Sequence, residues 1–318
     1  MGTRACRRLV LPLFLAAAAA ASAVPPAVQG LRAKRASVVV TAAPGAPEQL
    51  KLSLAGAPAT SMVVSWISKD AVPTDGSCFD RPLQVWSPDG DQSGTGPGSG
   101  SSPPTPFPFP LKTGCALAGS EVRYGQAPGA LSSSQINASL LFADHDVDAN
   151  DNPTNVSTPR TVHVVVLSGL QPATRYHYQV RSAGGPWSAI FPFRTMAVKA
   201  DTLSLLITAD VGASGLPPSA VKDAMQGRFD MHLHAGDIAY DMPVNHGATG
   251  DLFSNQLSNI SRSIPFQAWP GNHETDDNHC DFLNYRARFF NQNLTADTAT
   301  NARGPATRAV RQLALLLI

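Results

Sequence analysis

The sequence is poor in net charge, in cysteine and in long apolar runs, and each shortage narrows the class of protein it encodes. Its 24 Lys and Arg nearly cancel its 23 Asp and Glu, which leaves a formal charge of +1. Bulk electrostatics therefore give no reason to expect a nucleic acid or an anionic membrane as partner. With 43% hydrophobic residues in 318 positions, the chain can bury a sizeable core and is long enough for two domains.

The apolar run near the N-terminus is a poor candidate for a retained membrane anchor. The run "LVLPLFLAAAAAA" is interrupted by Pro12, preceded by arginines and followed by the small triplet Ala21-Ser22-Ala23. This is the layout of a secretory signal peptide. We therefore predict a signal peptide at 1–23, a linker or pro-segment at 24–45, and a secreted protein or one of an acidic vacuolar compartment.

Four acceptor sequons for N-glycosylation agree with a secreted chain. Each has the pattern Asn-x-Ser or Asn-x-Thr, which oligosaccharide transfer requires. The acceptors are Asn137, Asn155, Asn259 and Asn293.

Only four cysteines are present, and removal of the signal peptide with Cys6 leaves three. In an oxidising compartment Cys78 and Cys115 are candidates for a disulfide that closes the loop between them. Cys280 then pairs between chains, stays free, or pairs with a residue outside this sequence.

Residues 46–196 have the sequence pattern of an antiparallel β-sandwich. "TSMVVSWIS" and "TRYHYQVRS" alternate between two faces, and turn signals separate such runs. The run "LSGLQPATRYHYQV" resembles the corner of fibronectin type III-like domains, where a Leu, a Pro and a Tyr lead into a late strand. Residues 71–116 are rich in Gly, Ser and Pro, which predicts a disordered surface insertion within this domain.

After Thr195 the pattern changes to apolar runs that alternate with helical segments. "LSLLITAD", "FDMHLHAGD" and "IPFQAWPGNHE" read as strands, and "AVKDAMQG" and "DLFSNQLSNI" as helices. This alternation predicts a parallel α/β sheet over 197–300, with the first strand buried on both faces.

Polar side chains follow all three of these strands. The strand ends read Asp210-Val-Gly212, Gly236-Asp237-Ile-Ala-Tyr240 and Gly271-Asn272-His273-Glu274. Since ligands gather at the carboxyl ends of parallel strands, we expect these loops to form one site. The glycines let the backbone turn sharply and approach a bound group.

The neighbouring pairs of potential ligands are weaker candidates. His232 and His234 lie on one face of their strand but precede its end, so packing against a helix with structural hydrogen bonds is the favoured interpretation. His279 and Cys280 form a lone pair in a polar loop, which is weak evidence for a metal.

The three loops resemble the calcineurin-like metallophosphoesterase superfamily and, within it, the purple acid phosphatases. Asp-x-Gly at 210–212 with a Tyr at 240 is the purple acid phosphatase variant of the superfamily's opening Asp-x-His, and a phenolate suits ferric iron. "TSMVVSWIS", "VRYG" and "LSGLQPATRYHYQV" also resemble the fibronectin-like domain of plant-type members. The implied fold is a fibronectin type III-like β-sandwich followed by the first half of a metallophosphoesterase α/β sandwich.

The resemblance also implies a role for each loop residue. Asp210 and Tyr240 would bind Fe(3+), Asp237 would bridge two metals, and Asn272 would bind Zn(2+), Fe(2+) or Mn(2+). His273 would stand over the phosphate and steady the leaving oxygen, or serve as a hydrogen-bonded neighbour. Glu274, with Gly271 and Gly236, would orient these groups. The implied partner is a phosphate ester substrate, and a homodimer is a candidate assembly.

The chain departs from the family downstream of these loops. The family needs three further histidines, one from a V-x-x-H-like and two from a G-H-x-H segment, whereas His279 is the only His after His273. The metal centre is therefore incomplete unless a full-length form supplies them. Residues 301–318 are an atypical tail, interpreted either as an amphipathic helix or as a translated intron, frameshift or alternative exon.

Three functions remain open at this point. The first is a metal-dependent acid phosphatase that hydrolyses phosphate monoesters through a binuclear Fe(III)-M(II) centre. The second is a catalytically inactive secreted glycoprotein or binding module, which the missing histidines favour. The third is a phosphodiesterase or pyrophosphatase of the same superfamily, which would differ only in its pocket loops.

Overall fold

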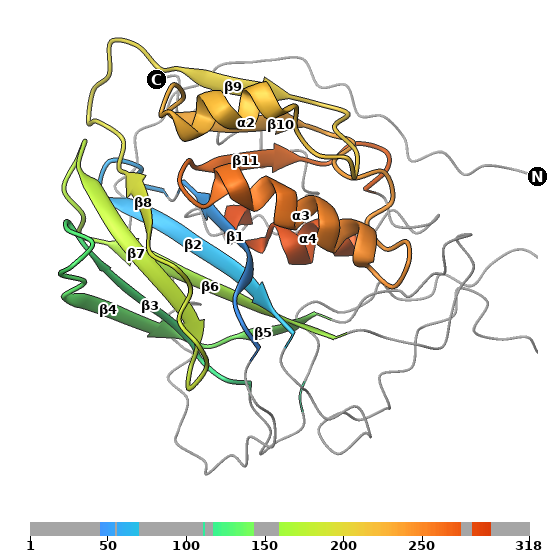
Figure 1. Cartoon of the computed structure of the whole chain (residues 1–318), viewed down its shortest axis with the longest axis horizontal. Coiled ribbons are helices and arrows are strands. Elements are labelled where there is room, and N and C mark those ends of the chain that lie inside the picture. Colours follow the sequence, from blue (N-terminus) through green and yellow to red (C-terminus); the bar gives the residue numbers. More distant parts are fainter. Residues whose placement is uncertain are drawn as a thin grey trace, which may run out of the picture.

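The computed structural model describes residues 45–54, 56–69, 111, 117–142, 159–274 and 282–293. Eight strands form two four-stranded antiparallel sheets, followed by a three-stranded parallel sheet with its helices (Figure 1). The predicted fold class, a fibronectin-like β-sandwich followed by an α/β unit, is confirmed. The predicted signal peptide, nearly all of the linker and of the insertion, and the tail lie outside the described residues.

The first sheet of the sandwich has the order β1-β2-β6-β5, and the second has the order β4-β3-β7-β8. The strands are β1 Glu48–Ser53, β2 Ser61–Ser68, β3 Ser120–Gly125, β4 Ser133–Asn137, β5 Leu140–Phe142, β6 Arg160–Ser168, β7 Arg175–Ser182 and β8 Phe191–Arg194. The predicted alternation of β7 is confirmed, because Tyr176, Tyr178 and Val180 are buried between more exposed neighbours.

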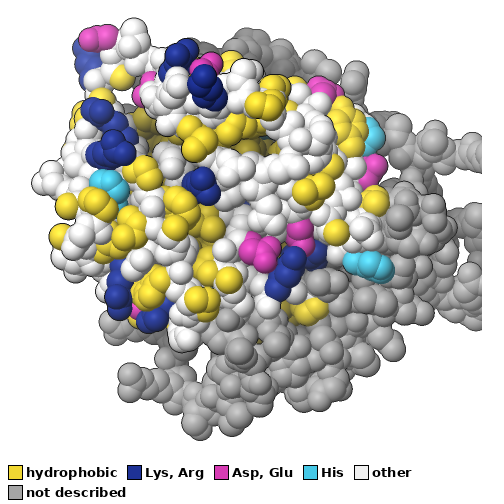
Figure 2. All heavy atoms as spheres, in the orientation of Figure 1, with side chains coloured by type: hydrophobic (Ala, Val, Ile, Leu, Met, Phe, Trp, Pro, Cys, Tyr) yellow, Lys and Arg dark blue, Asp and Glu magenta, His cyan; other side chains and the backbone are white. Residues whose placement is uncertain are grey.

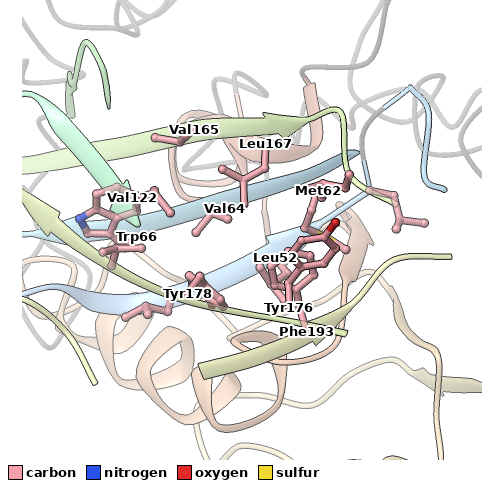
Figure 3. Close-up of a cluster of buried hydrophobic side chains, with 14 of the residues drawn as sticks. Leu52, Met62, Val64, Trp66, Val122, Val165, Leu167, Tyr176, Tyr178 and Phe193 are labelled. Atoms are coloured by element: carbon pink, nitrogen blue, oxygen red, sulfur yellow. The ribbon is translucent and has the colours of Figure 1, made fainter. Parts of the chain in front are cut away.

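The sandwich core fills the space between these two sheets (Figure 3). From β2, Met62, Val64 and Trp66 point into it, as the alternation predicts, and Tyr178 and Phe193 meet them from the second sheet. The predicted corner is also present, since the backbone N–H of Gln171 donates to the Tyr176 hydroxyl over 2.9 Å.

The α/β unit covers the outer face of the first sheet. Its elements are β9 Leu205–Thr208, α2 Pro218–Met225, β10 Met231–Ala235, α3 Ala248–Ser261, β11 Phe266–Trp269, α4 Leu283–Arg288 and the 3-10 helix η1 Phe290–Asn293. Val63 of β2 packs with Leu283 and Ala287 of α4, so β2 is buried on both faces. The two units therefore share a continuous interior.

The three strands of the α/β unit are parallel, in the order β11-β10-β9. The expectation that the first of them is buried on both faces is wrong, because Ile207 of β9 is 65% exposed. Within the described residues β9 is the edge of its sheet, and an edge strand has a neighbour on one side only. Among these residues, no helix has both the length and the apolar character that crossing a bilayer requires.

Candidate metal centre

The loops after β9, β10 and β11 carry a cluster of strained backbone positions. Asp210, Asp237, Tyr240 and Asp241 have φ values of 52°, 47°, 52° and 74°. A positive φ is uncommon for residues other than glycine, and such strain gathers where the surrounding structure holds a functional geometry. Three of these four positions, Asp210, Asp237 and Tyr240, are predicted ligands.

Asp210 and Tyr240 meet across two loops. The Tyr240 hydroxyl donates to Oδ1 of Asp210 over 2.8 Å. Its ring lies against Gly212, where a Cβ atom would stand only 3.3 Å from Cδ2 of Tyr240. The hydrogen bond to Asp210, with a smaller contribution from burial, raises the pKa of Tyr240 to about 12. The phenol therefore keeps its proton at neutral pH unless a cation replaces it.

Asp237 meets the third loop at Gly271 and His273. The backbone N–H of His273 donates to Oδ1 of Asp237 over 3.1 Å. A Cβ atom at position 271 would overlap both Oδ1 and the backbone nitrogen of Asp237. Gly236 is crowded in the same way, because its Cβ would lie 3.0 Å from Cα of Gly271. The two predicted glycines thus permit the close approach of these loops.

Glu274 ties the second loop to the third. It is fully buried, and its two carboxylate oxygens each accept a 2.7 Å hydrogen bond, from the N–H groups of Ile238 and Gly271. Burial raises the pKa of Glu274, although these hydrogen bonds favour the charged form and oppose the rise. In this structure Glu274 therefore holds the second and third loops together.

His273 stands beside Tyr240, with ring centroids 4.5 Å apart, and its Nδ1 lies 3.2 Å from Oδ1 of Asp241. Burial lowers the pKa of His273, but the hydrogen bond and the charge of Asp241, joined by Asp237 and Glu274, outweigh it and raise the pKa overall. The sequence analysis missed Asp241. Its position directly after Tyr240 was the available signal.

The described residues contain no group of three or more His, Cys, Asp or Glu side chains arranged to hold a metal ion. Asn272 is exposed within the third loop. The geometry thus brings Asp210, Tyr240, Asp237 and His273 to one edge of the sheet.

His232 and His234 have structural roles, as predicted. Both are buried, and the Thr208 hydroxyl lies 2.7 Å from Nε2 of His232 and 2.8 Å from Nδ1 of His234. His234 also packs against Phe253 of α3, with ring centroids 6.3 Å apart. Burial, as the largest cause, lowers the pKa of both rings. Two neutral rings that share one hydroxyl are core residues rather than a second site.

Two predicted glycosylation sites fall on described side chains. Asn259 is exposed on α3, while Asn137 is half-buried and its side chain donates to the carbonyl of Val164 over 3.2 Å. The site residues outside the described side chains are Asn155, Asn293, Cys78 and Cys115, and the weaker candidates His279 and Cys280 lie there as well.

Comparisons with known proteins agree with the resemblance. The profile described as "Purple acid Phosphatase, N-terminal domain" matches residues 111–195. Acid phosphatase type 7 of Homo sapiens is 38% identical over 133 residues, which cover 40% of this chain and 29% of that protein. The protein of the same name from Mus musculus is 34% identical over 178 residues, which cover 55% and 38%.

Among solved structures, a purple acid phosphatase from yellow lupin (Lupinus luteus) seeds matches 77% of this chain and 41% of its own, at 14% identity and a TM-score of 0.48. The chain spans between 29% and 38% of the length of the acid phosphatases type 7 that it matches. Residues 111–195 thus match a purple acid phosphatase N-terminal domain, and the chain is similar to acid phosphatases type 7 over part of their length.

Proposed function

We propose that the chain contributes to a metal-dependent acid phosphatase that hydrolyses phosphate monoesters at a binuclear Fe(III)-M(II) centre. The observation that carries this proposal is the meeting of Asp210, Tyr240, Asp237 and His273 at the carboxyl ends of three parallel strands. Ligand sites of α/β sheets lie at this edge.

The donor set at this edge fits hard cations. A phenol and carboxylates are oxygen ligands, and the proton that Tyr240 shares with Asp210 occupies a place that a cation can take. Asp210 and Tyr240 would hold the ferric ion, Asp237 would bridge, and Asn272 would hold Zn(2+), Fe(2+) or Mn(2+). When bound, such a pair of ions neutralises phosphate charge and supplies an activated hydroxide. Histidine ligands supplied by a full-length form would complete the set.

In this proposal His273 donates a proton to the leaving oxygen. Its Nδ1 side faces Asp241, which leaves Nε2 for a substrate, and the raised pKa favours the protonated ring. An acid near the leaving oxygen speeds phosphate ester cleavage because the departing alkoxide is otherwise too basic.

The test is hydrolysis of p-nitrophenyl phosphate by the purified chain, reconstituted with Fe(3+) and Zn(2+) or Mn(2+), next to Asp237→Asn. Asp223→Asn is the matched control, because it removes a carboxylate from α2, away from the strand ends. Loss of activity of at least about 100-fold in Asp237→Asn alone is expected, since removal of a first ligand costs more than the 10 to 100-fold of an outer partner.

An inactive binding protein is the competing function, and it is favoured because no three His, Cys, Asp or Glu side chains among the described residues are grouped to hold a metal ion. It predicts a folded chain that takes up no metal and hydrolyses neither p-nitrophenyl phosphate nor bis(p-nitrophenyl) phosphate. Hydrolysis of the diester in preference to the monoester would instead favour the phosphodiesterase alternative.

We further propose that the chain enters the secretory pathway and carries a glycan on Asn259, whose exposure on α3 supports the assignment. Expression in a secreting eukaryotic host, with and without peptide N-glycosidase F, tests this. Asn259→Gln is expected to lose one glycan's mass, and an unchanged mass would remove Asn259 from the glycosylated sites.

A further inference from the structure

The outer face of the second sandwich sheet is basic, in contrast to the balanced charge of the whole chain. From position 152 to position 200 the sequence contains no Asp or Glu. The same stretch supplies β7 and β8, whose outward side chains include Arg175, Arg181 and Arg194. Figure 2 shows Lys and Arg side chains at separate places over the sandwich, with hydrophobic side chains between them.

Two of these arginines face each other directly across neighbouring strands. Arg175 of β7 and Arg194 of β8 are register partners, and both are exposed. Like charges in directly opposed positions destabilise a sheet. No carboxylate among the described residues forms an ion pair with either arginine. An anion that bridges both guanidinium groups would therefore relieve the repulsion between them.

Further along the same face, Trp187 holds two more guanidinium groups. Arg123 of β3 and Arg181 of β7 lie over the Trp187 ring, with their Cζ atoms 4.5 Å and 4.3 Å from its centroid. Glu121 pairs with Arg181 and is the only acid within the strands of this sheet. Stacking occupies the flat side of each guanidinium. Glu121 accepts from Nε of Arg181, so the terminal N–H groups of Arg181 and the N–H edge of Arg123 are the donors left for an anion, with less side-chain freedom to lose.

The cations form a row along β7. Arg175 and Arg181 are six positions apart and lie on one side of the strand, with His177 and Gln179 between them. At about 3.3 Å per residue the row is about 20 Å long. Its donors thus lie at the two ends of one strand, rather than around a single pocket.

We propose that this face binds a linear anionic polysaccharide, such as a sulfated glycan, whose acidic groups contact Arg175 and Arg194 at one end and Arg123 and Arg181 at the other. A chain of regularly spaced sulfates or carboxylates matches a row of planar guanidinium donors, which bind such groups with two N–H bonds. A membrane surface fits less well, because Trp187 is fixed between two arginines and so is not free to insert.

The proposal is tested by titrating the full chain with heparin at physiological ionic strength. The double substitutions Arg175→Gln/Arg194→Gln and Arg123→Gln/Arg181→Gln each remove two charges from the face. Lys222→Gln/Arg228→Gln is the matched control, since it removes two exposed cations from α2 and the turn after it. Thermal melting of each variant shows whether its fold is retained.

Each double substitution on the face is expected to weaken heparin binding at least about tenfold, because two charge-assisted contacts are lost. The control is expected to bind as the unsubstituted chain does. Equal weakening in the control would mean that only overall charge is sensed, and would overturn the proposal. So would binding of phosphatidylserine vesicles or duplex DNA that depends on these arginines while heparin binding does not.

Discussion

The hydroxyl of Tyr240 lies 2.8 Å from Oδ1 of Asp210, although 30 residues separate the two in the chain. Both residues have positive φ, and both follow parallel neighbouring strands. The contact is therefore a product of topology, because the carboxyl ends of β9 and β10 meet at one edge of the sheet. A proton is shared at the point where the proposed ferric ion would bind.

Substitution of Tyr240 by Phe is expected to abolish the visible absorption band of the iron-loaded chain, because the band requires a phenolate bound to iron. Stability should change little, since the side chain is 38% exposed. Absorption spectra after Fe(3+) addition provide the measurement. Tyr124→Phe, in the sandwich strand β3, is the control and should keep the colour. A colour retained in Tyr240→Phe would remove this residue from the ferric site.

Substitution of Glu274 by Gln should loosen the loops without altering a proposed ligand. The amide keeps one acceptor, but its NH₂ group would face an N–H donor of either Ile238 or Gly271. One buried N–H is left unpaired, so the free energy of unfolding should fall by about 1–3 kcal/mol. Urea unfolding measures it, with the more exposed Glu48→Gln as control. Equal urea midpoints for the two variants would show that the hydrogen bonds of Glu274 do not stabilise the loops.

Gly271→Ala should be among the most damaging small substitutions at this edge. The added methyl group would overlap Asp237, so the loop has to move away from β10. Gly129→Ala is a matched control, because nothing lies within 4 Å of the Cβ added there. Fe(3+) uptake and the melting temperature should both fall in Gly271→Ala and stay unchanged in Gly129→Ala. If both variants behave alike, the close approach of the loops is not required.

The positions of the loop residues were predictable from the sequence because their signals are local. Alternation along β2 and β7, and apolar runs that end in Gly and Asp, each lie within one strand and its turn. The burial of β9 was predicted wrongly, since an apolar run does not reveal whether its strand lies at the edge of the sheet. Ile207 is exposed for that reason.

Contacts between distant segments could not be predicted in this way. Gln49 and Asp251 are 202 residues apart, and Arg288 lies beyond both, yet their side chains share hydrogen bonds. Lys51 lies between the core residues Leu50 and Leu52 of β1, but α3 and η1 pack on the opposite face of the strand, and Lys51 is 1% exposed. A pattern in one strand contains no information about what packs over it.

The buried Lys51 makes stability depend on pH. Burial, with the charge of Arg288 added, lowers its pKa from 10.5 to about 7, while Asp251 opposes the shift. The folded chain therefore binds this proton more weakly than the unfolded chain does. Burying the charged Lys51 therefore lowers the free energy of unfolding, by at most about 5 kcal/mol. This destabilisation is complete below pH of about 7 and disappears as pH rises to about 10.5.

Lys51→Met should remove this cost, so the variant's gain in unfolding free energy over the unsubstituted chain should be larger at pH of about 6 than at pH of about 9. Urea unfolding at both pH values measures it. Lys222→Met, on the surface helix α2, is the control and should show no such dependence. A gain independent of pH would mean that Lys51 is already neutral throughout or is hydrated.

Asp251 of α3 is the point at which the sandwich and the α/β unit are joined electrostatically. It accepts hydrogen bonds from Arg160 of β6, at 2.9 and 3.0 Å, and from Arg288 of α4, at 2.8 Å. Both arginine side chains are at most 1% exposed. These cations hold the pKa of Asp251 far below its usual range, against the opposing effect of burial.

Asp251→Asn keeps the shape of the side chain but leaves two buried guanidinium groups without a counter-charge. Breaking a buried ion pair in this way typically costs about 3–5 kcal/mol, whereas Asp223→Asn, at an exposed pair with Arg228, should cost less than about 1 kcal/mol. Because β6 and α4 belong to different units, their unfolding should also separate, so that Trp fluorescence and limited proteolysis report different midpoints. Coincident midpoints with undiminished stability would show that apolar packing of α4 on β2 suffices to hold the two units together.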